Sequence, residues 1–216
     1  MWPFTWLKNK IANRSIEDII NSELKKRKIA KDQKILSKFT GTKSALLGYA
    51  MYQKFTENLC FEPDQELIDD IRVFIEKYHD FVSTKKDSIP QDDFLRFACM
   101  SYHTWQKIVD LKCRLSKENE VEEENARRPY EEPPGKYLKI KWKLEETELT
   151  RQIKKRITPD MPLKSIGISF PEIILIENDL RKLGYMIYLP SVELDKCTNK
   201  NVGYFILKCY NNTWKR

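Results

Sequence analysis

Apolar residues recur at helical spacing through the first half of the chain. The clearest pattern follows Pro63, where Asp64 is a good N-cap and the apolar positions after it are Leu67, Ile68, Ile71, Phe74, Ile75 and Tyr78. Two earlier helices are predicted, one over residues 15–39 capped by Ser15 and one after a break and cap at Gly41 and Thr42. The pattern therefore predicts a helical domain over residues 15–117.

Residues 88–117 contain two consecutive helix starts. Ser88 and Gln91 have the spacing of a capping box, and Ser101 is a second N-cap, so two helices would meet at Cys99-Met100. A short helix, a tight turn and a longer helix are the parts of a helix-turn-helix. Its inward contacts would come from Phe94, Leu95, Ala98, Met100, Trp105 and Ile108. Its outward positions would be Tyr102, His103, Gln106, Lys107 and Asp110.

The run Ser101-Tyr-His-Thr104-Trp105 resembles the start of the recognition helix in phage helix-turn-helix DNA-binding proteins of the small terminase type. Two positions differ from that pattern: Cys99 stands where the turn usually has Gly, and Leu95 where a small residue is usual. The resemblance implies a DNA-binding unit whose base contacts come from Tyr102, His103, Gln106 and Lys107. The alternative is an ordinary helical hairpin whose outward residues contact only water.

The composition changes after Lys117. Residues 118–134 contain seven glutamates, two arginines and three prolines, which is typical of a solvated, proline-rich linker. We therefore divide the chain into an N-terminal segment (1–14), a helical domain (15–117), a linker (118–135) and a C-terminal domain (136–216).

The C-terminal domain has a different pattern. Residues 137–144 alternate strictly between polar and apolar, and two further strands, forming a hairpin, are predicted over 186–194 and 201–210. Helices are predicted over 145–157 and 169–185, the second ending at Gly184. The order β-α-α-β-β predicts a small α+β domain with an antiparallel sheet, so the fold class is mostly α followed by α+β.

Two functions fit this predicted domain. As a winged helix it would bind phosphates through Lys154, Lys155 and Arg156. As an assembly domain it would pair with neighbouring subunits through its hairpin.

Positive charge is concentrated early in the chain. The formal net charge is +7, and residues 21–43 alone carry eight basic residues against two acidic ones, a net charge of +6. Such a stretch is typical of a surface that binds phosphate backbones; the alternative is a solvated helix face. The candidate phosphate-binding residues are Lys25, Lys26, Arg27, Lys28, Lys31 and Lys34.

The N-terminal segment combines aromatic rings with lysines. Trp2, Phe4 and Trp6 precede Lys8 and Lys10, a composition suited to a short interfacial membrane anchor. The alternative is that these rings dock on the protein itself or on a neighbouring subunit. No run of 18 apolar residues and no cleaved signal peptide is seen in the sequence.

Catalytic and metal-binding motifs are absent from the sequence. It has two histidines, no CxxC pair, and none of the GxSxG, HExxH or GxGxxG motifs. The five cysteines are odd in number and lie mostly among apolar neighbours, which favours reduced thiols and a cytoplasmic protein. We therefore expect no cofactor, no metal and no enzymatic activity.

The sequence thus predicts a non-enzymatic nucleic-acid-binding protein of phage, virus or mobile-element type. Its partners would be nucleic acid, with duplex DNA favoured, and copies of itself or other subunits, in the host cytoplasm or the virion. The alternative is a viral matrix- or capsid-type structural protein that contacts a membrane or neighbouring subunits through the N-terminal segment.

Overall fold

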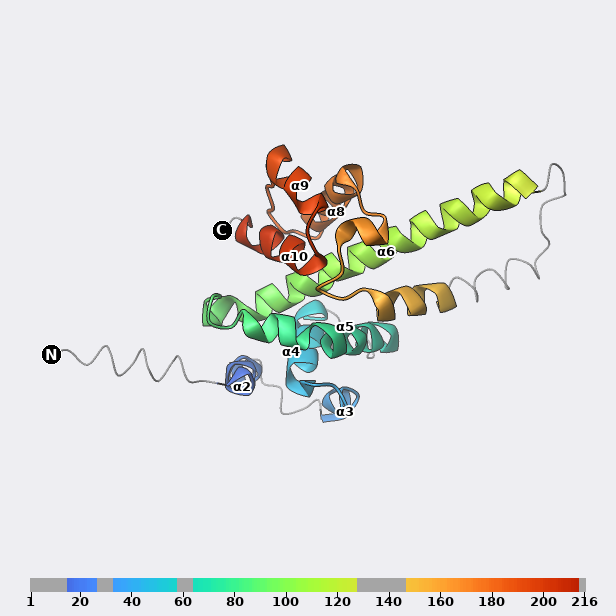
Figure 1. Ribbon diagram of the computed structural model, residues 1–216. Helices are drawn as coiled ribbons and strands as arrows, with labels where there is room; N and C mark the ends of the chain where they lie inside the picture. The colour runs from blue at the N-terminus through green and yellow to red at the C-terminus, as the bar shows by residue number, and fades with distance from the viewer. Residues whose placement is uncertain (1–14, 27–32, 58–63, 128–146, 214–216) are drawn as a thin grey trace. The chain divides into compact units, whose positions relative to one another are not determined.

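The computed structural model describes residues 15–26, 33–57, 64–127 and 147–213, and for residues 26 and 119–127 it describes the backbone only. The chain divides into two compact units, Met1–Tyr102 and His103–Arg216. Figure 1 shows that the described residues of both units are built from helices.

The first unit contains α2 (Ile16–Lys26), α3 (Gln33–Ser37), α4 (Ala45–Phe55), α5 (Gln65–Thr84) and the 3-10 helix η2 (Gln91–Asp93). Its helix starts follow local capping chemistry. Asp64 accepts hydrogen bonds from the backbone N–H groups of Glu66 and Leu67, as predicted, and the Ser15 hydroxyl accepts one from the N–H of Asp18. Within the region where one helix is expected, 15–39, the described residues form α2 and α3, and residues 27–32 between them lie outside the described residues.

The residues that follow α3 approach α4 so closely that position 48 requires a glycine. Phe39 is fully buried, and a Cβ atom added at Gly48 would lie 2.8 Å from its ring. Gly41 has a φ of +91° and makes the predicted break before α4, but the N-cap is Ser44 and not Thr42. The Thr42 hydroxyl instead donates to the carbonyl of Phe39.

The core of the first unit is aromatic. Phe74 and Tyr78 stack one turn apart on α5, with ring centroids 4.8 Å apart, and the ring of Tyr102 meets Phe74 edge-on at 5.7 Å. All three residues are buried.

The helix-turn-helix prediction is wrong in its geometry. α6 (Phe94–Arg127) is one helix of 34 residues that begins in the first unit and continues into the second, with no turn at Cys99-Met100 (Figure 1). Ser101 caps nothing, because it lies inside the helix and its hydroxyl donates to the carbonyl of Phe97 at 2.7 Å. The capping box predicted at Ser88 is also absent, since the Ser88 hydroxyl donates back to the carbonyl of Lys85.

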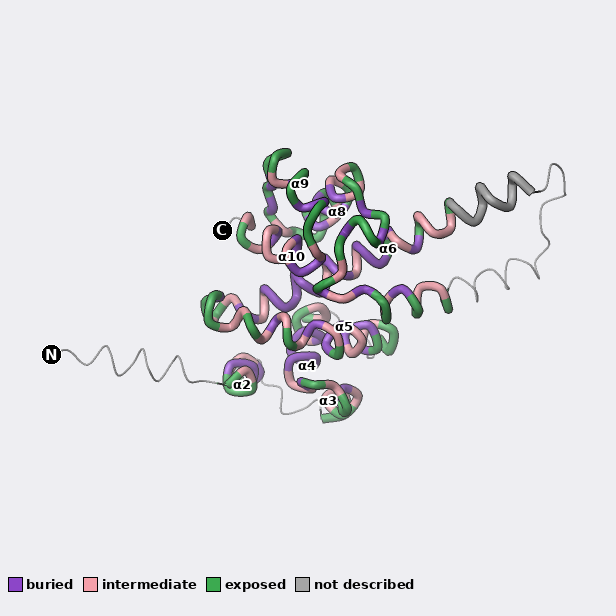
Figure 2. Tube along the Cα trace, viewed as in Figure 1, coloured by how far each residue is buried: buried purple, intermediate pink, exposed green. Residues whose placement is uncertain are grey.

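Burial explains why α6 does not break. The apolar positions on both sides of Ser101 are buried, so packing outweighs the local preference of serine for a helix start. Burial declines toward residue 118, where Leu115 and Ser116 are half-buried (Figure 2).

The second unit contains the continuation of α6, a helix over 147–156, the 3-10 helix η3 (Leu163–Ile166), α8 (Phe170–Lys182), α9 (Ser191–Thr198) and α10 (Val202–Asn211). The predicted helices over 145–157 and 169–185 are thus confirmed to within a few residues. α8 begins with a capping box between Ser169 and Glu172 and is followed by Gly184 with a φ of +89°.

The predicted α+β C-terminal domain is wrong. Within the described residues there are no strands, only the isolated bridges Pro162–Asn201 and Ile187–Thr213. Residues 191–198 and 202–211 form α9 and α10 where the sequence predicts a β-hairpin, so a winged helix is not formed there. The strand predicted over 137–144 lies outside the described residues.

The prediction for α10 is wrong because its residue types favour strands. Val202, Phe205, Ile206 and Cys209 are all buried, and their spacing is that of one face of a helix. The Asn201 side chain accepts a hydrogen bond from the N–H of Tyr204 at 2.8 Å and caps the helix. Helical spacing and a cap therefore outweigh the β-propensity of valine, isoleucine and phenylalanine.

Candidate interaction surfaces

The basic stretch of α2 and α3 is accessible where the structure describes it. Lys25 and Lys34 are exposed and Lys38 is half-buried, and none of the three makes an ion pair with another described residue. In contrast, Lys43, at the end of the same stretch, pairs with Asp80 at 2.6 Å. The Lys26 side chain and Arg27, Lys28 and Lys31 lie outside the described residues.

Tyr102 cannot be a base contact in this conformation. Only 1% of its surface is exposed, and its ring lies 5.0 Å from that of Phe55 between centroids. The prediction that Tyr102 faces outward is therefore wrong. Without a break at Cys99-Met100, the helix turns this position into the core of the first unit.

His103 is an internal contact of the second unit. Its Nδ1 atom lies 2.7 Å from the hydroxyl of Tyr185, with which it shares a hydrogen bond, and the two rings meet edge to face. Burial lowers the pKa of His103 to about 4, with the nearby charge of Lys107 a smaller cause. The imidazole is thus neutral at pH 7 and ties α6 to the segment that follows α8.

Lys107 and Gln106 are half-buried on the same helix. Lys107 forms an ion pair with Asp110 at 3.6 Å. The hydrogen bond from Lys182 lowers the pKa of Asp179 on α8, and the charge of Lys107 is a smaller cause of the same shift. Partial desolvation raises the pKa of Asp110, although its side chain is 54% exposed, and the nearby charges of Lys107 and Lys154 oppose this shift. Because these charges alternate in sign, the positive charge of Lys107 is partly neutralised within the unit.

The helix over 147–156 carries a second group of cations. Lys155 and Arg156 are exposed, whereas Lys154 is half-buried near Asp110. Arg151 pairs with Glu148 on its own helix at 2.8 Å. Two of the three phosphate-binding residues predicted for a winged helix are therefore accessible. The described residues contain no β-hairpin that could serve as its wing.

Sequence reasoning missed an exposed apolar surface on the second unit. The exposed large apolar side chains are Leu175 (46% exposed), Leu183 (47%), Met186 (47%), Tyr188 (60%) and Val192 (66%), and we call them the 175–192 surface. Four of the five fall within ten residues of chain. Isolated exposed apolar residues are ordinary, whereas apolar side chains that form one contiguous patch are typical of interaction sites.

A buried carboxylate holds residues 186–189, the extended part of this surface, in place. Glu177 is 3% exposed, and its Oε1 atom accepts hydrogen bonds from the Leu189 N–H at 3.1 Å and from Arg181 at 2.6 Å. Arg181 in turn donates to the carbonyl of Ile187 at 2.8 Å. These contacts keep Ile187 and Leu189 facing inward, so that the alternate residues face solvent.

Exposure alternates over residues 186–189 in the structure, because Ile187 and Leu189 are buried whereas Met186 and Tyr188 are exposed. All four residues are apolar, so the sequence does not reveal which of them face solvent. The partner of this segment is the end of α10, where the Tyr188 N–H donates to the carbonyl of Asn212 at 3.2 Å.

The described residues support neither a metal site nor a membrane-spanning helix. These residues contain no group of three or more His, Cys, Asp or Glu side chains arranged to hold a metal ion. None of their helices is both long and apolar enough to cross a membrane. Trp2, Phe4 and Trp6 lie outside the described residues. Cys99, Cys113, Cys197 and Cys209 are buried and form no disulfide with one another.

No protein-family model matches the chain, and neither a curated protein nor a solved structure matches it.

Proposed function

We propose that the chain is a non-enzymatic nucleic-acid-binding protein that holds the phosphate backbone through the basic residues of α2 and α3. The observation that supports this most is that Lys25 and Lys34 are exposed without an ion pair to any described residue, in a stretch of net charge +6. Exposed cations that make no ion pair with a described residue are available to replace the counterions condensed on DNA or RNA.

Binding of this kind is independent of base sequence. Reading base edges in the major groove requires a protruding element with free side chains. Of the four base contacts that the phage-type resemblance implies, Tyr102 is buried and His103 is bonded to Tyr185. The protein therefore binds duplex DNA mainly through phosphates, and its affinity falls steeply with salt.

The test is fluorescence anisotropy of the full chain with labelled duplex DNA, single-stranded DNA and RNA across a salt series. We expect the triple variant Lys25→Gln, Lys34→Gln, Lys38→Gln to weaken binding to all sequences alike. On duplex DNA, the slope of log affinity against log salt should decrease by about 0.9 for each lysine that no longer binds a phosphate, up to about 2.7 for three lysines.

A matched control removes the same charge elsewhere. Lys54, Lys182 and Lys196 each pair with an acidic side chain three residues away, so the triple substitution of these residues by Gln lowers the net charge by the same amount. The control should change the slope much less. Equal slopes for the two variants, or no binding by the wild-type chain at low salt, would reject the proposal.

A second candidate function is assembly with protein subunits through the second unit, and the 175–192 surface favours it. We expect the variant Leu183→Ser, Tyr188→Ser, Val192→Ser to shift the full chain toward monomer in sedimentation velocity. Asn178→Ala, an exposed substitution on α8, is the control. A wild-type chain that is monomeric at all concentrations would rule out self-assembly.

A further inference from the structure

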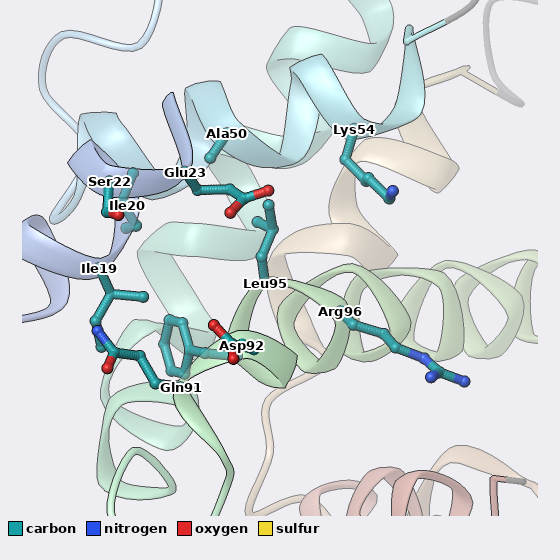
Figure 3. A pocket seen from close by; sticks show the side chains of 11 residues that line it. Ile19, Ile20, Ser22, Glu23, Ala50, Lys54, Gln91, Asp92, Leu95 and Arg96 are labelled. Atoms are coloured by element: carbon teal, nitrogen blue, oxygen red, sulfur yellow. The ribbon is translucent and has the colours of Figure 1, made fainter. Parts of the chain in front are cut away.

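The first unit contains a pocket of about 270 Å³ between α2, α4 and the start of α6 (Figure 3). Its apolar walls come from Ile19 and Ile20 of α2, Ala50 of α4, and Phe94 and Leu95 of α6. Small-molecule sites usually measure about 300–1,000 Å³. The pocket is therefore suited to one large side chain better than to a whole cofactor.

The charged residues around the pocket are not evenly distributed. In Figure 3 the carboxylates of Glu23 and Asp92 lie on opposite sides of the space, with Leu95 beside Glu23. Lys54 and Arg96 also border the pocket, but their charged ends extend away from Asp92. Lys54 in addition pairs with Glu57 at 3.2 Å.

Asp92 is exposed and makes no hydrogen bond or ion pair with another described residue. A carboxylate in this position attracts a cation from solvent or from a ligand, whereas it repels the phosphates of nucleic acid. The pocket therefore differs in charge from the lysines of α2 and α3, although α2 contributes to both.

We propose that this pocket binds a peptide segment in which an aromatic side chain is closely followed by lysine or arginine. The ring fills the space between the apolar walls, and the basic residue lies against Asp92. The exposed carboxylate of Asp92 favours this partner over an acidic or uncharged apolar segment. This peptide-binding site is separate from the proposed nucleic-acid-binding surface, and its existence does not depend on nucleic-acid binding.

Residues 1–10 of this chain have the composition that the pocket selects, since Trp2, Phe4 and Trp6 precede Lys8 and Lys10. A synthetic peptide of this sequence, labelled at its C-terminus, is therefore a suitable probe. Binding would be measured by fluorescence anisotropy with the full chain. A second full-length protein, with Trp2, Phe4 and Trp6 replaced by Ala, excludes competition from the chain's own segment.

We expect saturable binding to at least one of the two proteins. Stronger binding to the Ala-substituted protein than to the wild type would support the proposal and identify the chain's own segment as an occupant. Asp92→Lys should weaken peptide binding by about fivefold or more, because a surface attraction becomes a repulsion. Asp87→Lys is the matched control, since Asp87 is also exposed and lies outside the pocket lining.

Three results would overturn the proposal: no binding to either protein, equal weakening by Asp92→Lys and Asp87→Lys, or equal binding of a peptide whose Lys8 and Lys10 are replaced by Glu. Thermal unfolding of each variant confirms that the fold is kept. DNA affinity separates the two sites, because Asp92→Lys adds positive charge and should not weaken DNA binding.

Discussion

The two units leave their large apolar side chains in different places. In the described part of the first unit every large apolar side chain is at least half-buried, whereas the second unit exposes five of them. The first unit encloses its aromatic rings between long helices such as α5. The second unit combines the continuation of α6 with helices of 8 to 13 residues and an extended segment, and this segment buries one face and exposes the other. The difference indicates that the second unit is the one with an apolar surface available to partners.

Removing the carboxylate that holds the extended segment should change the second unit most and leave the first unit unchanged. Glu177→Ala leaves the Leu189 N–H unpaired and Arg181 without its buried partner, and we expect a decrease of about 3 to 4 kcal/mol in the free energy of unfolding. Urea denaturation measures this decrease. Asp195→Ala, at an exposed position of α9, is the control and should change stability little.

If Glu177 acts as described, hydrogen exchange in Glu177→Ala should accelerate over residues 185–190 and not over α5. Uniform acceleration in both units would contradict the local role assigned to Glu177.

Acidification should lower the stability of the second unit, because His103 is half-buried there and its partial burial disfavours the charged imidazolium. Its pKa is about 4 in the folded chain against an ordinary value of 6.5. Between these values the unfolded chain binds a proton that the folded chain does not, so stability falls as the pH drops from about 6.5 to about 4. The decrease amounts to at most about 3 kcal/mol.

Urea denaturation at a series of pH values tests this expectation. His103→Gln should remove that part of the pH dependence. A wild-type stability that is constant between the two pKa values, or an unchanged pH dependence in His103→Gln, would show that His103 is not protected from protonation.

The smallest expected effect concerns α10. Asn201→Ala removes the side chain that caps this helix and should lower the free energy of unfolding by about 1 kcal/mol. Asn201→Ser keeps a capping oxygen and should restore most of this stability. If both substitutions are neutral in urea denaturation, the start of α10 is held by packing of Val202 and Phe205 and not by its cap.

The sequence is sufficient to predict a helix where the capping residues and the apolar periodicity agree. α5 is an example, because Asp64 marks its start and the buried positions recur on one face along the helix. The end of α8 is another, since Gly184 adopts the positive φ that such a terminus favours.

The prediction fails where the environment outweighs local preference. Ser101 has the chemistry of a cap, yet it lies in a buried part of α6. Val202, Phe205 and Ile206 favour strands by type, yet their spacing buries one face of a helix.

The candidate surfaces can be predicted only in part. The lysines of α2 and α3 are identified from composition, because charge is visible in a sequence. The 175–192 surface is not, because whether Tyr188 or Val192 is exposed depends on which side of the backbone the rest of the unit covers. The roles of Glu177 and Tyr185 depend on hydrogen bonds to residues 12 and 82 positions away along the chain.

The continuity of α6 affects how the protein can be divided. Domains are usually cut or recombined in exposed linkers, where few backbone hydrogen bonds are broken. Here the division between Tyr102 and His103 falls inside a helix. A fragment that ends at Tyr102 would leave the last four carbonyls of its helix without their N–H donors, and a fragment that begins at His103 would expose four N–H groups in the same way. A cut at this boundary would therefore destabilise the ends of both fragments, in contrast to a cut in an exposed linker.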